Sequence, residues 1–141
     1  MHQGNGNSEI FKNDKNIFTF SMHCKSNYPA KKSKSDLDIE LDDNLEDKEY
    51  IKILKKNLDE LNNLKFDFVF YVAGVDVHHN DKLGKLKLTD NGISQREKLV
   101  IENFFSKNIP LCGVLGGGYN KDFNKLVELH ALLHKNCASF L

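Results

Sequence analysis

The sequence has no excess of charge of either sign and no long apolar run. Lysine plus arginine and aspartate plus glutamate number 20 each, so the basic surface with which proteins bind nucleic acids is missing. No stretch approaches the ~18 apolar residues of a membrane-spanning helix. The opening residues, MHQGNGNSE, also lack the basic and apolar regions of a signal peptide. We therefore expect a cytoplasmic protein that makes no direct contact with nucleic acids or membranes.

Cysteine is scarce as well, and no two of the three cysteines have C-x-x-C spacing. Cys112 lies inside an apolar stretch. This pattern favours buried thiols in a reducing compartment over disulfides. The chain has the length of one domain with a sizeable core, and it contains no internal repeat.

Apolar patterning predicts alternating strands and helices. Runs of β-forming residues predict strands at 17–23, 68–73 and 110–115. Amphipathic spacing predicts helices at 47–63, from Thr89 or Asp90 to about Lys107, and at 122–137. Residues 8–11 fit one helical turn, while 36–41 fit either a short edge strand or an extended segment. The alternation favours an α/β fold with a parallel sheet and right-handed crossovers.

Two of the predicted strands are each followed by a polar residue. Asp76 comes after Ala-Gly at the end of 68–73, and Tyr119 comes after three glycines at the end of 110–115. Ligands of open α/β sheets bind at the carboxyl ends of the strands, so these residues indicate two walls of one site. Asp76 is either a metal ligand or catalytic acid, or it caps a turn. Tyr119 either donates its hydroxyl to an oxyanion or is an ordinary rim tyrosine.

The histidines and glycines do not by themselves indicate a known motif. His78 and His79 are adjacent, and adjacent side chains of an extended loop point apart, so the pair is a poor chelator of one ion. His130 and His134 have i, i+4 spacing without the glutamate of H-E-x-x-H, and we expect them, like His23, to be structural or surface residues. The glycines at 116–118 lack the lysine and the spacing of a phosphate-binding loop.

Seven short segments occur in the order seen in the histone deacetylase family, which the chain resembles over about residues 2 to 135. They are HQGNG at 2–6, SMH at 21–23, NYP at 27–29, SDLDI at 35–39, AGVD at 73–76, DKLG at 81–84 and GGGY at 116–119. The HQGNG and NYP segments are most similar to the class IV and bacterial acetoin-utilisation branches. The resemblance implies the three-layer, arginase-like α/β fold of that family.

The resemblance also implies a zinc-dependent active site. His2 matches a zinc-binding histidine and Asp76 a zinc-binding aspartate. Tyr119 matches the tyrosine that donates a hydrogen bond to the tetrahedral oxyanion. Gly117 and Gly118 match a wall of the channel that holds the acyl group.

Three further positions match the family's site. The hydroxyl of Ser21 and the carbonyl of Met22 fall where a structural monovalent cation, usually potassium, is bound. Asn5 falls where the family has an Asp or Asn near a catalytic histidine. The implied reaction is hydrolysis of acetyl or longer acyl amides of lysine or of small amines. In it, zinc polarises the carbonyl, a histidine accepts the proton of the attacking water, and Tyr119 with zinc stabilises the oxyanion.

Some parts of the family's site have no counterpart in this sequence. The first zinc-binding aspartate and the tandem acid–base histidines would lie before Met1, as would half of the sheet. We therefore expect residues 1–141 to be the C-terminal part of a deacetylase domain, with an exposed sheet edge where a missing N-terminal half would pair. With two zinc ligands instead of three, the chain alone should bind zinc weakly and be inactive.

Two alternatives remain open. The first is a catalytically inactive remnant or an interaction protein that pairs with a separate half of the same fold. The second is another metallohydrolase of this architecture, such as an arginase-like enzyme. That enzyme would need several carboxylates bridging two metals, and the single Asp76 argues against it.

Overall fold

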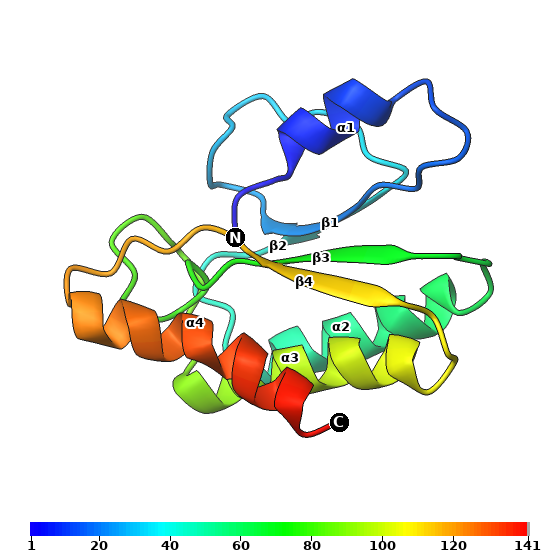
Figure 1. The fold of residues 1–141 in the computed structure, drawn as a ribbon. Helices are drawn as coiled ribbons and strands as arrows, with labels where there is room; N and C mark the ends of the chain where they lie inside the picture. The colour runs from blue at the N-terminus through cyan, green and yellow to red at the C-terminus, as the bar shows by residue number, and fades with distance from the viewer. Residues whose placement is uncertain (141) are drawn as a thin grey trace.

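The computed structural model describes residues 1–140, whose helices and strands alternate along the chain except where two strands, β1 and β2, follow one another (Figure 1). The strands are β1 (Phe20–Cys24), β2 (Leu37–Leu41), β3 (Val69–Ala73) and β4 (Leu111–Leu115). The helices are α1 (Asn5–Phe11), α2 (Asp47–Leu61), α3 (Asp90–Phe105) and α4 (Phe123–Ala138). Each strand and helix predicted from the patterning is present, with ends that differ by a few residues.

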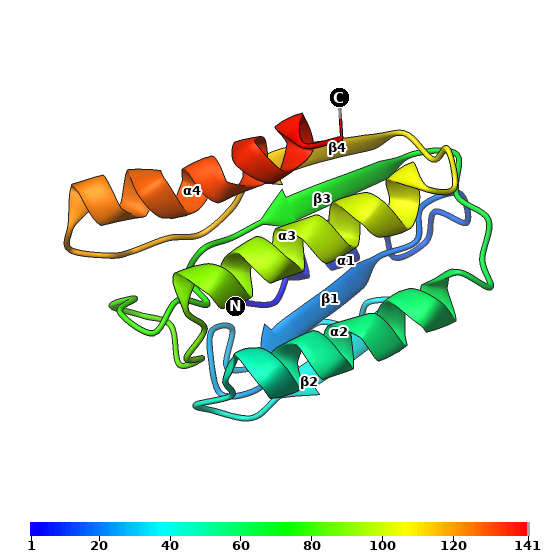
Figure 2. The ribbon, with the colours of Figure 1, turned by 90° about the horizontal axis from the view of Figure 1, so that it is seen from below.

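The strands form two parallel pairs. In β1–β2, Phe20 lies opposite Leu37, and in β3–β4, Val69 lies opposite Leu111. The arrows of β1, β3 and β4 point in the same direction in Figure 2, and β2 runs parallel to β1. The predicted parallel α/β arrangement is confirmed, and residues 36–41, left open as a strand or an extended segment, contain β2.

The long helices begin where side chains cap their free backbone N–H groups. The Thr89 hydroxyl accepts from Gly92 N–H at the start of α3, and the Asp122 carboxylate accepts from Lys125 N–H at the start of α4. Both helix starts agree with the prediction. Helix α1, by contrast, begins at Asn5 and is longer than the single predicted turn.

The helices cover the strands unequally. Helices α2, α3 and α4 lie together on one side, and α1 with its flanking loops lies on the other (Figures 1 and 2). The core between the strands and α2–α4 is apolar, and its most buried side chains include those of Leu41, Val75, Leu86, Leu88, Ile93 and Leu129. Burial of these side chains, at about 25 cal/mol per Å², supplies the main driving force for folding.

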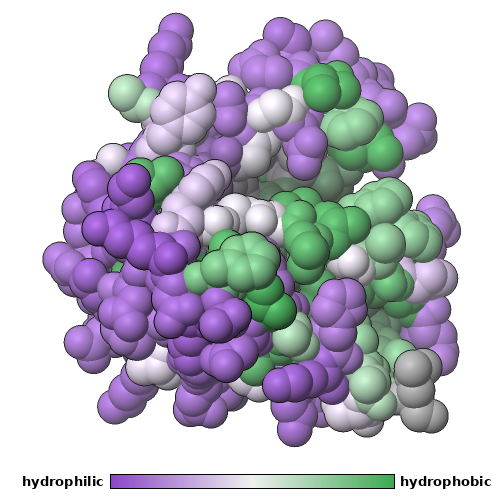
Figure 3. Space-filling model, turned by 60° about the vertical axis from the view of Figure 1, so that its left-hand side comes forward, coloured by the Kyte–Doolittle hydropathy of each residue, from purple (hydrophilic) through white to green (hydrophobic). Residues whose placement is uncertain are grey.

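The other side of β3 is bare. Successive side chains of a strand point to opposite faces of the sheet. Those of Phe70 and Val72, and of Phe68 just before the strand, are 71%, 54% and 50% exposed. Figure 3 shows apolar side chains gathered on one side of the molecule around a hollow, between polar surfaces. Large apolar side chains in a row are unusual on a free surface and are typical of an interface.

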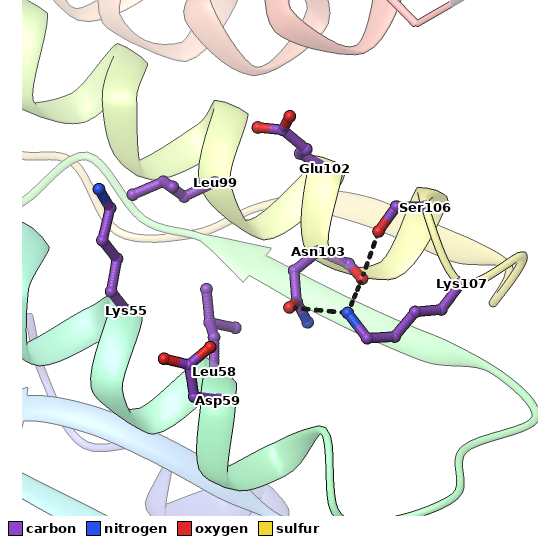
Figure 4. Close-up of a pocket in the computed structure, with 8 residues that line it drawn as sticks. All are labelled: Lys55, Leu58, Asp59, Leu99, Glu102, Asn103, Ser106 and Lys107. Carbon is purple, nitrogen blue, oxygen red and sulfur yellow. Dashed lines mark hydrogen bonds between the residues drawn. The ribbon is translucent and has the colours of Figure 1, made fainter.

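A groove of about 280 Å³ separates helices α2 and α3 (Figure 4). Its walls are formed mainly by polar and charged side chains, namely Lys55, Leu58, Asp59, Leu99, Glu102, Asn103, Ser106 and Lys107. None of them belongs to the candidate site. Within residues 1–140 no helix combines the length and the apolar character that crossing a bilayer requires.

Candidate functional site

The loops that follow β3 and β4 are joined backbone to backbone. The N–H groups of Val75 and Asp76 both donate to the Gly117 carbonyl, at 2.6 and 3.1 Å. Both loops leave the carboxyl ends of neighbouring parallel strands, which is why they meet. The predicted convergence of the Asp76 and GGGY segments is therefore present in the structure.

Close approach of these loops requires residues without a side chain. A Cβ at Gly117 would lie 2.2 Å from Asp76 Oδ2, and a Cβ at Gly116 would lie 2.8 Å from Gly74 Cα. At Gly118, an added Cβ would meet side chains of Val75 and Leu126 at 2.7 Å. Glycine is needed at these positions because a side chain would not fit. Backbone conformation does not require it, since none of these glycines has a positive φ.

His2 reaches Asp76 from the opposite end of the sequence. Its Nδ1 lies 3.0 Å from Asp76 Oδ2, so the imidazole N–H and the carboxylate form a hydrogen bond. The segment before α1 is anchored beside β1, because Cys24 N–H donates to the Met1 carbonyl. Gln3 is buried and its amide bonds both Ser33 and the Asp38 carboxylate. These contacts hold the short segment that carries His2, and the sequence patterning did not reveal the part that Gln3 has in them.

The ring of Tyr119 packs edge-to-face against the imidazole of His2. Their centroids are 5.8 Å apart and their planes meet at 79°. The ring of Tyr28 also lies edge-on to this imidazole, at a centroid distance of 6.5 Å and an angle of 67°. Tyr119 remains 44% exposed, so a ligand can reach its ring. The structure thus brings together His2, Asp76, Gly117 and Tyr119 from three separate segments.

Ser21 and Met22, predicted to bind a monovalent cation, lie on β1. Ser21 is buried; its Oγ accepts from Gly4 N–H at 3.4 Å and lies 3.0 Å from His23 Nδ1. Met22 pairs with Ile39 in the β1–β2 ladder. Among the described residues no hydrogen bond or ion pair joins Ser21 or Met22 to Asp76, and the cation role stays a prediction from the resemblance.

The remaining histidines have other partners. His78 is buried, its Nε2 lies 3.0 Å from Asp90 Oδ1, and burial lowers its pKa. His79 Nδ1 lies 3.1 Å from the Leu88 carbonyl. His23 is fully buried, and His130 lies beside Gly118. Burial lowers the pKa of both His23 and His130, which favours their neutral forms.

An ionic cluster beneath the site was not anticipated from the sequence. Arg96 is buried on α3; it donates to the Gly74 carbonyl at 2.7 Å and to the Glu97 carboxylate, which also accepts from the Tyr71 hydroxyl. Burial works to lower the pKa of Arg96, but Tyr71 and Glu97 beside it raise that pKa well above its usual value. Arg96 therefore stays charged and holds the backbone two residues before Asp76.

The side chains of His2 and Asp76 have the chemistry of part of a zinc site. Asp76 Oδ1 is buried without a hydrogen-bond partner, although Met1 N lies 3.2 Å away. Such an oxygen is a ready ligand, and zinc takes imidazole nitrogen and carboxylate oxygen. Within residues 1–140 no group of three or more His, Cys, Asp or Glu side chains is arranged so that it could hold a metal ion. The pair thus fits as two of the three protein ligands that a catalytic zinc site needs.

The fold and the solved structures first define the class of protein. The structure of acetylpolyamine aminohydrolase from Burkholderia pseudomallei superposes with a TM-score of 0.83, at 19% identity, over 99% of this chain and 43% of that one. The chain is therefore an α/β protein with the arginase and deacetylase fold.

The family follows from the sequence comparison. The histone deacetylase domain matches residues 1–133, and the chain belongs to the histone deacetylase family. An uncharacterized protein of Picosynechococcus sp. is 46% identical over 136 residues, covering 96% of this chain and 45% of that protein. Histone deacetylase 2 of Arabidopsis thaliana is 30% identical over 130 residues, covering 89% of this chain and 34% of that protein. The chain thus spans less than half the length of these relatives.

Proposed function

We propose that this chain is the C-terminal part of a zinc-dependent deacetylase that hydrolyses N-acyl amides of lysine or of small amines. The observation that carries the proposal is the meeting of His2, Asp76 and Tyr119 at the carboxyl ends of parallel strands. These residues come from three segments within the stretch that matches the histone deacetylase domain. A relative named as a histone deacetylase supports the reaction class.

Each residue has a distinct role in the proposed reaction. His2 and Asp76 would hold zinc, which supplies polarisation of an amide carbonyl and a more acidic bound water. Tyr119 donates its hydroxyl to the oxygen on which negative charge develops. Gly117 and Gly118 form a wall without side chains, along which an extended acyl-amine chain can lie. Ser21 and Met22 would hold a structural potassium ion, away from the reacting groups.

The rest of the site would come from a further polypeptide segment, the N-terminal half of the same fold. Support comes from the two-ligand site and from the relatives, which are more than twice as long. The bare row of Phe68, Phe70 and Val72 is the surface on which that half would pack. On this proposal, the 141-residue chain alone binds zinc weakly and has no turnover.

The names of the similar proteins indicate two kinds of acetylated substrate. One relative is named for histones, and one structure of similar fold is named for acetylpolyamines. The two share an acetylated primary amine at the end of a flexible chain, and we propose that chemistry as the substrate. A cytoplasmic location is also proposed, supported by the three free thiols of the described residues; fractionation of cells that express a tagged chain would test it.

Zinc titration of the purified chain tests the metal site. The affinity should be weak, and His2→Ala or Asp76→Asn should lower it by about tenfold or more, since even neighbours of a ligand affect metal affinity that strongly. The matched control is His134→Ala, which removes an exposed histidine of α4. Equal affinities of all four proteins would contradict the assignment of His2 and Asp76.

Complementation tests the function. The preceding half of the Picosynechococcus relative, made as a separate chain, should restore cleavage of an acetyl-lysine or acetyl-amine reporter, and Tyr119→Phe should abolish it. Phe70→Lys should prevent the association without unfolding the chain, because Phe70 is exposed. Hydroxamate-sensitive turnover by the 141-residue chain alone would contradict the missing-half proposal.

An inactive remnant is the second candidate. It is favoured by the same two-ligand site, because a remnant or split partner needs the apolar interface but not a complete metal centre. A complex that forms tightly through the Phe70 surface and shows no turnover with either reporter would establish it over the active enzyme.

A further inference from the structure

Asp81 connects the two loops of the candidate site through its two carboxylate oxygens. Oδ1 accepts from the N–H groups of Leu83 and Gly84, at 2.9 and 2.8 Å, within its own loop. Oδ2 accepts from Tyr119 N–H at 2.7 Å, across a separation of 38 residues. An ionised carboxylate that accepts from backbone N–H groups makes strong, directional bonds.

The Oδ1 side of this arrangement is tied to Asp76. Gly84, which donates to Asp81, packs so closely on the Asp76 backbone that a Cβ would lie 1.9 Å from the Asp76 carbonyl oxygen. The turn that Asp81 closes is therefore in direct contact with the residue whose side chain bonds His2.

The Oδ2 side restrains a segment with little stiffness of its own. Tyr119 follows three consecutive glycines, which lose more conformational freedom on ordering than other residues. Asp81 is the hydrogen-bond partner of the Tyr119 backbone N–H, at the point where the glycine run ends. The direction in which the Tyr119 side chain leaves the backbone depends on the orientation of this peptide group.

We propose that Asp81 is a positioning residue that holds the Tyr119 ring over the His2–Asp76 pair. The catalytic consequence, that the tyrosine hydroxyl is aimed at the reacting carbonyl, rests on the proposed function; the positioning of the ring does not. Asp81 acts through the backbone, and it touches neither the metal ligands' side chains nor a substrate. Its loss should leave zinc affinity in place and release the tyrosine.

Nuclear magnetic resonance of the unmutated 141-residue chain gives the first test. A scalar coupling across the hydrogen bond, between Tyr119 backbone ¹⁵N and the Asp81 carboxyl carbon, is expected. Cross-relaxation between the ring protons of Tyr119 and His2 is expected as well, since their centroids are 5.8 Å apart. Absence of both signals in a folded chain would overturn the proposal, and this measurement depends on no variant.

Asp81→Ala provides the second test. The Tyr119 amide should exchange its hydrogen about tenfold faster or more, because a charge-assisted hydrogen bond is lost, and the Tyr119–His2 cross-relaxation should disappear. Amides of α3, such as that of Ile101, should keep their exchange rates, which separates release of Tyr119 from general unfolding. Unchanged Tyr119 exchange, or an equal change throughout α3, would refute the proposal.

The matched control is Asp14→Ala. Asp14 Oδ1 accepts from Asn16 N–H in an exposed turn, and no bond joins its side chain to a distant segment. It should leave Tyr119 unaffected. Zinc titration separates the two proposals when Asp81→Ala is compared with His2→Ala and Asp76→Asn. Retained zinc affinity of Asp81→Ala with a mobile Tyr119 supports positioning, whereas a zinc affinity that is unchanged in His2→Ala and Asp76→Asn rejects the proposed function alone.

Discussion

Gly117 is a residue at which the candidate site has no room for a side chain. Its carbonyl accepts from the loop of Asp76, and its α-carbon faces the Asp76 carboxylate directly. A side chain at this position competes with the carboxylate for the same volume. The presence of glycine here is therefore a requirement of packing between two loops.

Gly117→Ala should displace the Asp76 carboxylate, since the new Cβ would lie 2.2 Å from Oδ2. We expect a loss of about 1–3 kcal/mol in the free energy of unfolding, as for other overpacked sites, together with weaker zinc binding. Urea denaturation and zinc titration measure the two effects. Gly6→Ala, which has no neighbour within 4 Å, is the control and should not destabilise the chain.

Arg96 supplies the positive charge that neutralises the buried Glu97 carboxylate. Arg96→Met would remove the donor to the Gly74 carbonyl and leave the Glu97 carboxylate buried without its cation. Breaking a buried pair in this way costs about 3–5 kcal/mol, which we expect to find by urea denaturation. Lys56→Met, which breaks the exposed Lys56–Glu60 pair, should change stability by no more than about 0.5 kcal/mol. Similar small effects for both variants would contradict the buried role of Arg96.

At the scale of elements, the helices are held by both packing and caps. Helix α4 begins after its capping residue Asp122, whose side chain accepts from Lys125 N–H at 3.1 Å. Helix α2 begins after Glu46, whose side chain makes no capping bond. The two helices therefore offer a direct comparison of a capped and an uncapped start.

Asp122→Ala should lower the free energy of unfolding by about 1 kcal/mol, because an N–H group of the first turn loses its acceptor. Glu46→Ala is the matched control and should have almost no effect, since its side chain makes no cap bond. Thermal unfolding followed by circular dichroism measures both. A larger loss for Glu46→Ala than for Asp122→Ala would show that the caps are wrongly assigned.

The fold elements were largely predictable, and the parallel pairing of β3 with β4 followed from the helix α3 between them. The length of helix α1 was underestimated, because Gly4 and Gly6 at its start are typical of loops. In the site, Asp76 and Tyr119 stood out because each follows a strand. Asp81 was named only as part of the DKLG segment and Arg96 was not named at all, since their partners lie 38 and 22 residues away in the sequence.

At the scale of the whole molecule, stability should depend on pH near neutrality. Burial lowers the pKa of His23, His78 and His130 below the ordinary histidine value of 6.5. As the pH falls through 6.5, the unfolded chain therefore binds protons before the folded chain does. The free energy of unfolding should be greatest above this pH and should decrease toward the lowered pKa values.

Urea denaturation at pH 7.5, 6.5 and 5.5 would measure this dependence. His130→Gln should make it less steep, because one partly buried histidine with a lowered pKa no longer titrates. His134→Gln, an exposed residue of the same helix, is the control and should leave the slope unchanged. A stability that rises as the pH falls from 7.5 to 5.5 would contradict the buried, neutral state of these histidines.

The sequence by itself determined the class of fold, the family resemblance and the residues that carry chemical groups. It did so because apolar periodicity, glycines and short motifs are local properties that neighbouring residues express without the rest of the chain. The resemblance also implied that His2 and Asp76 share one site, but only the tertiary structure decided that Asp81 meets Tyr119 and that Arg96 meets the backbone before Asp76. It also decided that the outer row of β3 lies bare. Contacts between distant segments depend on how strands and helices pack, and that packing is a property of the whole molecule.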